Sequence, residues 1–188
     1  EIKSVSFDNM YVNLSVDTFG VSNVDFIIHY IDNSIKKDST LIYKIDHIKL
    51  KHTRFKYIDY RTVEGIPKVF NPGNILFKDI NGDISINRLS QDSLNVSIHS
   101  FSGIEKSGLQ LNGFSTKIEA GKKTAKIKQL ELKMPNSSVK LAQISANYNN
   151  ISNWKNFIEK AKVSLSIEDS ELNLKDITPF IPQFSAMA

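Results

Sequence analysis

Apolar and polar residues alternate along most of this chain, which is typical of β-strands with one buried and one wet face. In one stretch Leu94, Val96 and Ile98 alternate with Asn95 and Ser97. The same alternation recurs in segments near residues 10–16, 83–87, 109–118, 130–134, 139–148, 163–167 and 172–174. Turn signals, mostly Asn-Gly and Ser-Gly pairs, separate these segments. This spacing predicts a meander of strands with antiparallel neighbours throughout.

Two stretches depart from this rhythm. The run 26–31 is apolar on both faces, which predicts a strand that is covered on both sides. The segment 42–60 is long, and its alternation changes phase near Asp46-His47 and again near Tyr57-Ile58. Such phase changes predict a bulge or two strands in succession.

One amphipathic helix is expected, over residues 151–161. Ser152 is a suitable N-cap, and apolar side chains follow at helical spacing at positions 154, 157, 158 and 161. A helix this short cannot cover so many one-sided strands. The sequence therefore predicts an all-β fold, an antiparallel meander curled into a U-shaped β-groove or, alternatively, a closed β-sandwich.

The expected organisation has three parts. Residues 1–150 form a β-groove unit, residues 151–161 the short helix, and residues 162–188 the start of the next β repeat, truncated. Because the chain opens at Glu1 without a Met or a signal peptide, we expect it to be a piece of a longer protein.

The composition supports strands and argues against several classes of partner. Ile, Val and Thr supply 41 residues against only 7 Ala, and β-branched side chains favour strands. The 21 Lys are spread along the chain beside only 3 Arg, so we expect no nucleic-acid binding. The absence of Cys excludes disulfides, thiolate zinc sites and a Cys nucleophile.

Motifs for catalysis or metal binding are missing from the sequence. His47 and His52 are five residues apart and would point to opposite faces of a regular strand, so a shared metal ion is not expected. The run 79–83 looks like a calcium loop, but Gly82 occupies the fourth position and Ser90 replaces the bidentate Glu. No nucleophile elbow, P-loop or dinucleotide fingerprint occurs. We therefore expect no enzyme and no cofactor.

Three stretches together are similar to a known family. They are the run 83–111, whose Glu-Lys-Ser-Gly-Leu core at 105–109 is followed by Leu-Glu-Leu-Lys-Met-Pro-Asn-Ser-Ser-Val at 130–139, the run 166–182, and the run 45–60. These stretches resemble the repetitive β region of TamB/AsmA-type envelope proteins, especially the large versions found in Bacteroidetes. The resemblance covers roughly residues 40–185.

The resemblance implies a function and a location. Members of this family are anchored in the inner membrane, cross the periplasm and take part in phospholipid transfer and outer-membrane biogenesis. A curled sheet would offer an apolar groove to phospholipid acyl chains. A partner in outer-membrane β-barrel assembly would be contacted through parts that are not in this chain. An alternative function is a closed β-sandwich binding module of the adhesin or glycan-binding type.

The groove interpretation predicts which residues line the groove. We expect the apolar members of the alternating strands to face the groove and their polar partners, such as Ser97, Lys133, Lys140 and Ser164, to face water. The expected lining residues are Leu94, Val96, Ile98, Leu109, Leu111, Leu130, Leu132, Val139, Leu141, Val163 and Leu165. In the sandwich alternative the same residues form a closed core.

Overall fold

The structure is a computed structural model that describes residues 1–37, 41–62, 65–147 and 162–181. More than half of the chain is strand, as the alternation predicts. The elements, in chain order, are β1 (Ile2–Asp8), β2 (Tyr11–Val16), α1 (Asp25–Lys37), β3 (Tyr43–Asp59), β4 (Asn74–Ser90), β5 (Ser93–Glu105), β6 (Gln110–Leu111), β7 (Gly113–Gly121), β8 (Thr124–Lys133), β9 (Ser138–Asn147), β10 (Lys162–Ile167) and α3 (Leu174–Ile177).

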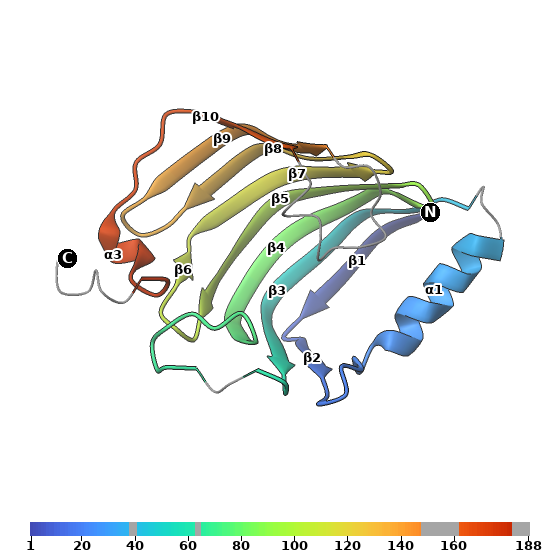
Figure 1. Ribbon diagram of the computed structural model, residues 1–188, viewed down its shortest axis with the longest axis horizontal. Helices are drawn as coiled ribbons and strands as arrows, with labels where there is room; N and C mark the ends of the chain where they lie inside the picture. Colours follow the sequence, from blue (N-terminus) through green and yellow to red (C-terminus); the bar gives the residue numbers. More distant parts are fainter. Residues whose placement is uncertain (38–40, 63–64, 148–161, 182–188) are drawn as a thin grey trace.

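The ten strands of the described residues belong to one sheet. Its order is β1-β3-β4-β5-β7-β8-β9-β10, with β2 also paired to β3 and β6 paired to β5. The sheet curls into an open trough rather than closing on itself (Figure 1). The prediction of an all-β curled sheet is therefore confirmed. The sandwich alternative needs two sheets, and the described residues form a single one.

The prediction of antiparallel neighbours throughout is wrong at one edge of the sheet. Both β1 and β2 run parallel to β3, with Ile2 opposite Ile45 and Tyr11 opposite Arg54. The segment between β2 and β3 contains α1 and carries the chain back along the sheet, as a parallel connection requires. Alternation along one strand reports which face each side chain takes, but it carries no information about the direction of the neighbouring strand.

The strand expected over residues 26–31 is wrong as well, because this run lies in α1. Phe26 and Tyr30, like Ile27 and Ile31, are four residues apart and share one side of a helix. Asp25 adds a negative charge to the first turn, which favours a helix N-terminus. The expected cover on both sides is also absent, since Phe26, Ile27 and Tyr30 are exposed. The helix predicted over 151–161 lies outside the described residues.

The long segment 42–60 contains a single strand, β3, with irregular pairing. Its register with β4 shifts between Ile45 and Ile48, which confirms the irregularity predicted near Asp46-His47. The register also shifts between Tyr43 and Ile45 and twice between Leu50 and Phe55, but the pairing is regular at Tyr57-Ile58, where the second irregularity was predicted.

Three backbone kinks lie next to one another across the first strands. Asn9, His52 and Asp79 have φ values of 53°, 47° and 50°, in the left-handed region. The N–H of Asn9 donates to Lys51 O at 3.0 Å, and Asn81 bridges the other two kinks by accepting from His52 N–H and donating to Asp79 O. Bulges of this kind bend a strand and increase its twist. We attribute part of the curl of the sheet to this line of kinks.

A group of buried side chains lies at one end of the trough, where the β5–β6 and β8–β9 turns meet the C-terminal segment. We call it the packed end, and it consists of Glu105, Ser107, Leu109, Met134, Ser137, Asp176 and Pro179.

Hydrogen bonds hold the packed end together. The carboxylate of Glu105, only 1% exposed, accepts from Leu76 N–H and Ser107 N–H. Asp176 accepts from the backbone N–H and side-chain amide of Asn136, at 2.9 and 3.0 Å. Phe70 N–H donates to Pro179 O, so the connection between β3 and β4 is tied to this end too.

The C-terminal part of the chain is joined to the same sheet. Strand β10 pairs antiparallel with β9, with Val163 opposite Ala146, and α3 follows at the packed end. The division into a unit over 1–150 and a next repeat over 162–188 stays a prediction.

Candidate functional site

One row of aliphatic side chains crosses the whole sheet. Residues directly opposite each other on neighbouring strands point to the same face, so the pairing register identifies the row. From β1 to β10 it contains Ile2, Ile45, Ile86, Val96, Ile118, Ile127, Ile144 and Leu165. Each of eight strands contributes one residue, and none of them is polar. We call this face of the sheet the groove floor.

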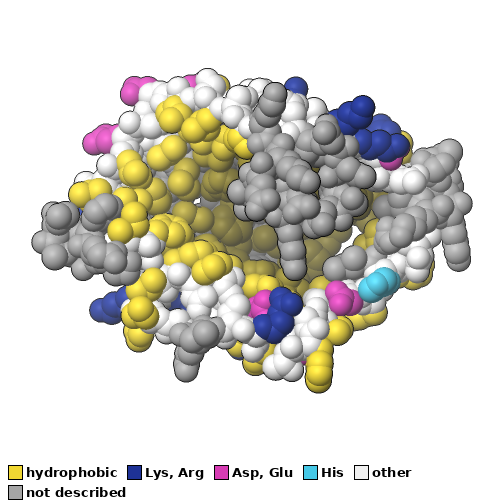
Figure 2. Space-filling model, viewed as in Figure 1, with side chains coloured by type: hydrophobic (Ala, Val, Ile, Leu, Met, Phe, Trp, Pro, Cys, Tyr) yellow, Lys and Arg dark blue, Asp and Glu magenta, His cyan; other side chains and the backbone are white. Residues whose placement is uncertain are grey.

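Neighbouring rows widen the groove floor. On one side the row is Tyr43, Leu89, Leu94, Ala120, Ala125, Ala146 and Val163. On the other side Leu130, Leu141 and Ile167 stand opposite one another, and beyond them Phe114, Leu132 and Val139 do the same. Figure 2 shows a hollow whose wall consists of hydrophobic side chains.

The opposite face of the same strands is polar. One residue further along each strand, the paired row is Ser85, Ser97, Lys117, Lys128, Gln143 and Ser166. Lys128 also forms an ion pair with Glu119, with Nζ 2.7 Å from Oε2. The sheet therefore separates an apolar floor from a polar outer face, as the alternation predicts.

The groove floor is not a closed core. Among the described residues the buried hydrophobic side chains are Ile80, Leu109, Met134 and Ala146, and of these only Ala146 lies in the floor rows described above. Most other floor side chains are half-buried, while Val163, Leu165 and Ile167 on β10 are exposed. A sheet with two partly open edges and a floor of this kind leaves apolar surface available to a ligand.

The structure places nine of the eleven predicted lining residues on the groove floor. They are Leu94, Val96, Ile98, Leu130, Leu132, Val139, Leu141, Val163 and Leu165. Leu109 is buried in the packed end, 7% exposed, and so it does not line an open groove. Leu111 is half-buried beside Gly103 on the short strand β6.

The predicted lining also omitted residues that the register brings together. Ile45, Ile86, Ile118, Ile127 and Ile144 form the centre of the floor, and the same alternation could have indicated them. Among the polar partners, Lys133, Lys140 and Ser164 are exposed as expected.

Ser97 differs from these polar partners. It lies on the outer face but is buried, and its hydroxyl accepts a hydrogen bond from the Asn87 amide at 2.8 Å. The hydrogen-bond partner of this hydroxyl is therefore the Asn87 side chain rather than solvent.

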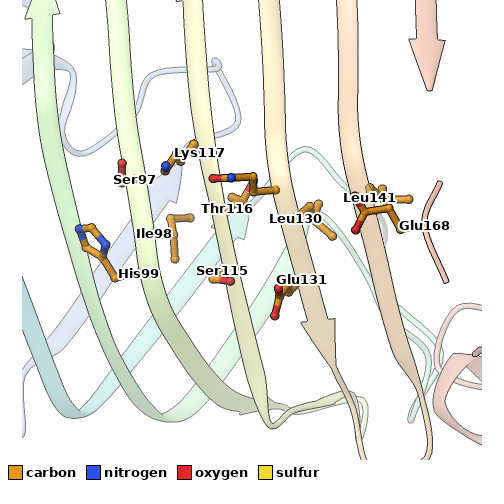
Figure 3. Close-up of a pocket in the computed structure, with 11 residues that line it drawn as sticks. Ser97, Ile98, His99, Ser115, Thr116, Lys117, Leu130, Glu131, Leu141 and Glu168 are labelled. Atoms are coloured by element: carbon orange, nitrogen blue, oxygen red, sulfur yellow. The ribbon is translucent and has the colours of Figure 1, made fainter. Parts of the chain in front are cut away.

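A cavity of about 480 Å³ lies against β5, β7, β8 and β9, with Glu168 at its border (Figure 3). Next to it Gln129 has a φ of 50° and Thr116 Oγ1 donates to Lys128 O at 3.1 Å. His99 lines this cavity, and its Nε2 lies 2.6 Å from Ser85 Oγ. Because the Ser85 hydroxyl donates to Asp46 O, it accepts from His99, and the imidazole therefore has a structural role.

The other two strand histidines have separate partners. His47 Nδ1 lies 3.0 Å from Asp83 Oδ1, and His52 Nδ1 lies 3.4 Å from Asp8 Oδ1. Within residues 1–37, 41–62, 65–147 and 162–181, no group of three or more Asp, Glu and His side chains could hold a metal ion. The described helices include none that is long and apolar enough to cross a membrane.

Comparison with protein-family models, with curated proteins and with solved structures found no match to this chain.

Proposed function

We propose that this chain is a non-enzymatic segment of a longer, periplasm-spanning envelope protein and that its groove floor shelters phospholipid acyl chains. The segment would contribute to phospholipid transfer and outer-membrane biogenesis as part of an inner-membrane-anchored protein. Contact with an outer-membrane β-barrel assembly partner would be made by other parts of that protein. The location and these partners come from the resemblance to TamB/AsmA-type proteins.

The observation that carries the proposal is the aliphatic row from Ile2 to Leu165. It spans eight strands without a polar residue, and in the described part of the chain no second sheet covers it. An acyl chain gains about 0.8 kcal/mol for each methylene that leaves water, so a continuous apolar trough holds it without designed polar contacts. A groove that binds lipids by burying their acyl chains would accept lipids with different headgroups.

A charge placed in the floor tests this proposal. Leu132 is half-buried on β8 between Phe114 and Val139, and Leu132→Asp would put a carboxylate where an acyl chain lies. We expect this variant to bind a fluorescent fatty acid at least tenfold more weakly than wild type. Lys133→Asp is the matched control, because Lys133 is the next residue and is exposed on the outer face. Equal binding by wild type and Leu132→Asp would contradict the proposal.

A further inference from the structure

A second cavity, of about 390 Å³, lies between the β3–β4 connection and the turn after β5, at the same end of the trough as the packed end (Figure 1). Residues 65–69 line it from the connection, and Lys106 and Ser107 line it from the turn. Its volume falls in the range of about 300–1,000 Å³ that is usual for small-molecule sites. We call it the lysine cavity, because Lys68 and Lys106 both line it.

The side chains that line the lysine cavity carry two positive charges and no negative one. Within the described part of the chain, neither Lys68 nor Lys106 forms an ion pair. Glu105, which precedes Lys106, does not line the cavity, and its carboxylate accepts from the N–H groups of Leu76 and Ser107. The two ammonium groups therefore have no counter-ion of their own among the described residues.

Ser107 adds a buried hydroxyl that the fold does not use. The residue is only 7% exposed, and its Oγ has no hydrogen-bond partner among the described residues. The turn itself is fixed, because Ser107 N–H donates to Glu105 Oε2 at 2.7 Å and Lys106 N–H donates to Leu76 O at 2.9 Å. Buried polar groups are nearly always bonded, so an unpartnered hydroxyl that lines a cavity indicates a group that binds a ligand.

The opposite wall of the lysine cavity is ordered as well. Asn71 Oδ1 accepts from Gly73 N–H at 2.9 Å, and Phe70 N–H donates to Pro179 O at 2.7 Å. Lys68 has a φ of 62°, in the left-handed region that few residues with a side chain adopt. Lys68 therefore extends from a connection that is tied to the rest of the fold.

Ser107 also borders a smaller cavity of about 160 Å³, next to α3. The charged side chains that line this smaller cavity are Lys175 and Asp176, whose charges cancel. The lysine cavity is thus the better site for an anion.

The groups around the lysine cavity suit a phosphate. Two ammonium groups and a hydroxyl donate hydrogen bonds, and they come from two separate segments of the chain. A tetrahedral phosphate offers oxygens in several directions, whereas a carboxylate offers them in one plane. Lysine binds phosphate as a point charge and does not need the planar geometry of an arginine pair.

We propose that the lysine cavity binds a phosphate group through Lys68, Lys106 and Ser107. A phospholipid headgroup and a free phosphate compound present the same group. Ile66 and Val69 line the same cavity and give a phospholipid an apolar contact that free phosphate does not use. The choice of a headgroup as the source rests on the proposed lipid function, whereas the phosphate site itself does not.

Isothermal titration of the whole chain with two probes tests this proposal. The probes are inorganic phosphate and dihexanoyl phosphatidylglycerol below its critical micelle concentration. We expect both to bind and to compete with each other. Tighter binding of the lipid assigns the site to a headgroup, and tighter binding of inorganic phosphate assigns it to a free phosphate compound.

The double variant Lys68→Gln, Lys106→Gln should bind both probes at least about tenfold more weakly, because each lysine contributes a charge-assisted hydrogen bond. The matched control is Lys123→Gln, Lys175→Gln, which removes the same charge from exposed lysines outside the lysine cavity and should bind like wild type. Absence of binding by wild type to both probes, or equal weakening in the two double variants, overturns the proposal.

Ser107→Ala separates binding from stability. Because the hydroxyl has no partner in the described fold, its removal should leave the melting temperature unchanged and weaken phosphate binding by about tenfold. Ser137→Ala is the control, since Ser137 Oγ accepts from Asn173 N–H, and it should lower the melting temperature while phosphate binding is kept. Wild-type phosphate affinity in Ser107→Ala contradicts the role of this hydroxyl.

Fatty-acid binding separates this proposal from the proposed function. The variant Lys68→Gln, Lys106→Gln should keep binding of the fluorescent fatty acid, which has no phosphate, and Leu132→Asp should keep binding of inorganic phosphate. A wild-type chain that binds phosphate but no fatty acid overturns the proposed function alone. A wild-type chain that binds the fatty acid but neither phosphate probe overturns the phosphate site alone.

Discussion

The groove floor and the packed end belong to the same curled sheet and its turns, yet their burial differs. In the packed end Leu109, Glu105 and Asp176 are buried, and hydrogen bonds to turns and to the C-terminal segment fix them. In the floor the residues of the aliphatic row are half-buried or exposed, and their positions depend on strand pairing.

This difference in burial indicates that one part of the sheet stabilises the fold and another part is available to bind a ligand. The packed end gathers buried side chains where three turns and the C-terminal segment meet. The floor is left free of tertiary cover by the described residues, so a change there costs less folding free energy. Residues in the floor are available to bind an acyl chain, while residues in the packed end are not.

The largest expected effect compares one substitution in the two regions. Leu109→Asp would bury an unpaired charge in the packed end and should cost about 4 kcal/mol of unfolding free energy or more. Leu132→Asp, in the half-buried floor, should cost about 1 kcal/mol. Urea unfolding of both variants measures the two losses. Similar losses at the two positions would mean that the floor is as closed as the packed end.

A smaller loss is expected at Glu105. Replacing it by Ala leaves the N–H groups of Leu76 and Ser107 without their carboxylate acceptor, which should cost about 2–3 kcal/mol. Glu131→Ala is the control, because Glu131 is exposed on β8 and its loss should change stability by less than about 0.5 kcal/mol. If the two variants unfold at the same urea concentration, Glu105 does not organise the packed end.

The third prediction concerns the stability of the fold at acidic pH. Burial raises the pKa of Asp176, but hydrogen bonds from Ser137 and Asn136 outweigh it and hold the pKa below the ordinary value of 3.8. Because the folded pKa is the lower one, the ionised carboxylate stabilises the fold above about pH 4, and this contribution is lost as the pH falls through the folded pKa.

Asp176→Asn tests this dependence. We expect the variant to be less stable than wild type by about 1–2 kcal/mol near neutral pH. The difference in stability between wild type and the variant should become smaller below pH 4, because the Asp176 carboxylate of wild type is then protonated and loses its charge. Melting temperatures measured across this range would show the convergence, and a gap that stays constant with pH would exclude a role for the charge.

Sequence alone predicted the parts of this molecule that depend on local pattern. The alternation in β8 correctly separated Leu130 and Leu132 from Glu131 and Lys133, because side-chain direction in a strand has a period of two. It failed for α1, since Phe26–Ile31 is rich in β-branched and aromatic residues that favour strands. The spacing of Phe26 from Tyr30 was the available helical signal.

The sequence did not show which strands pair with each other, or which polar residues far apart in the chain form hydrogen bonds. The floor row is defined by register, and register depends on kinks such as those at His52 and Asp79. Asp and His adopt a left-handed backbone more often than most residues, but few of them do, so the sequence does not show which ones form a kink. Leu109 alternates like a floor residue, yet it is buried in the packed end. The bond between Asn136 and Asp176 joins residues 40 positions apart.

The central claim is that the floor, and not the outer face, contacts acyl chains, and site-specific photo-crosslinking tests it most directly. Benzoylphenylalanine placed at Ile118 or Ile144 would face the floor, and at the adjacent Lys117 or Gln143 it would face outward. After irradiation of cells that express the chain, mass spectrometry should find phospholipid attached at Ile118 and Ile144 and none at Lys117 and Gln143. Equal attachment at all four positions, or none at the two floor positions, would contradict the account.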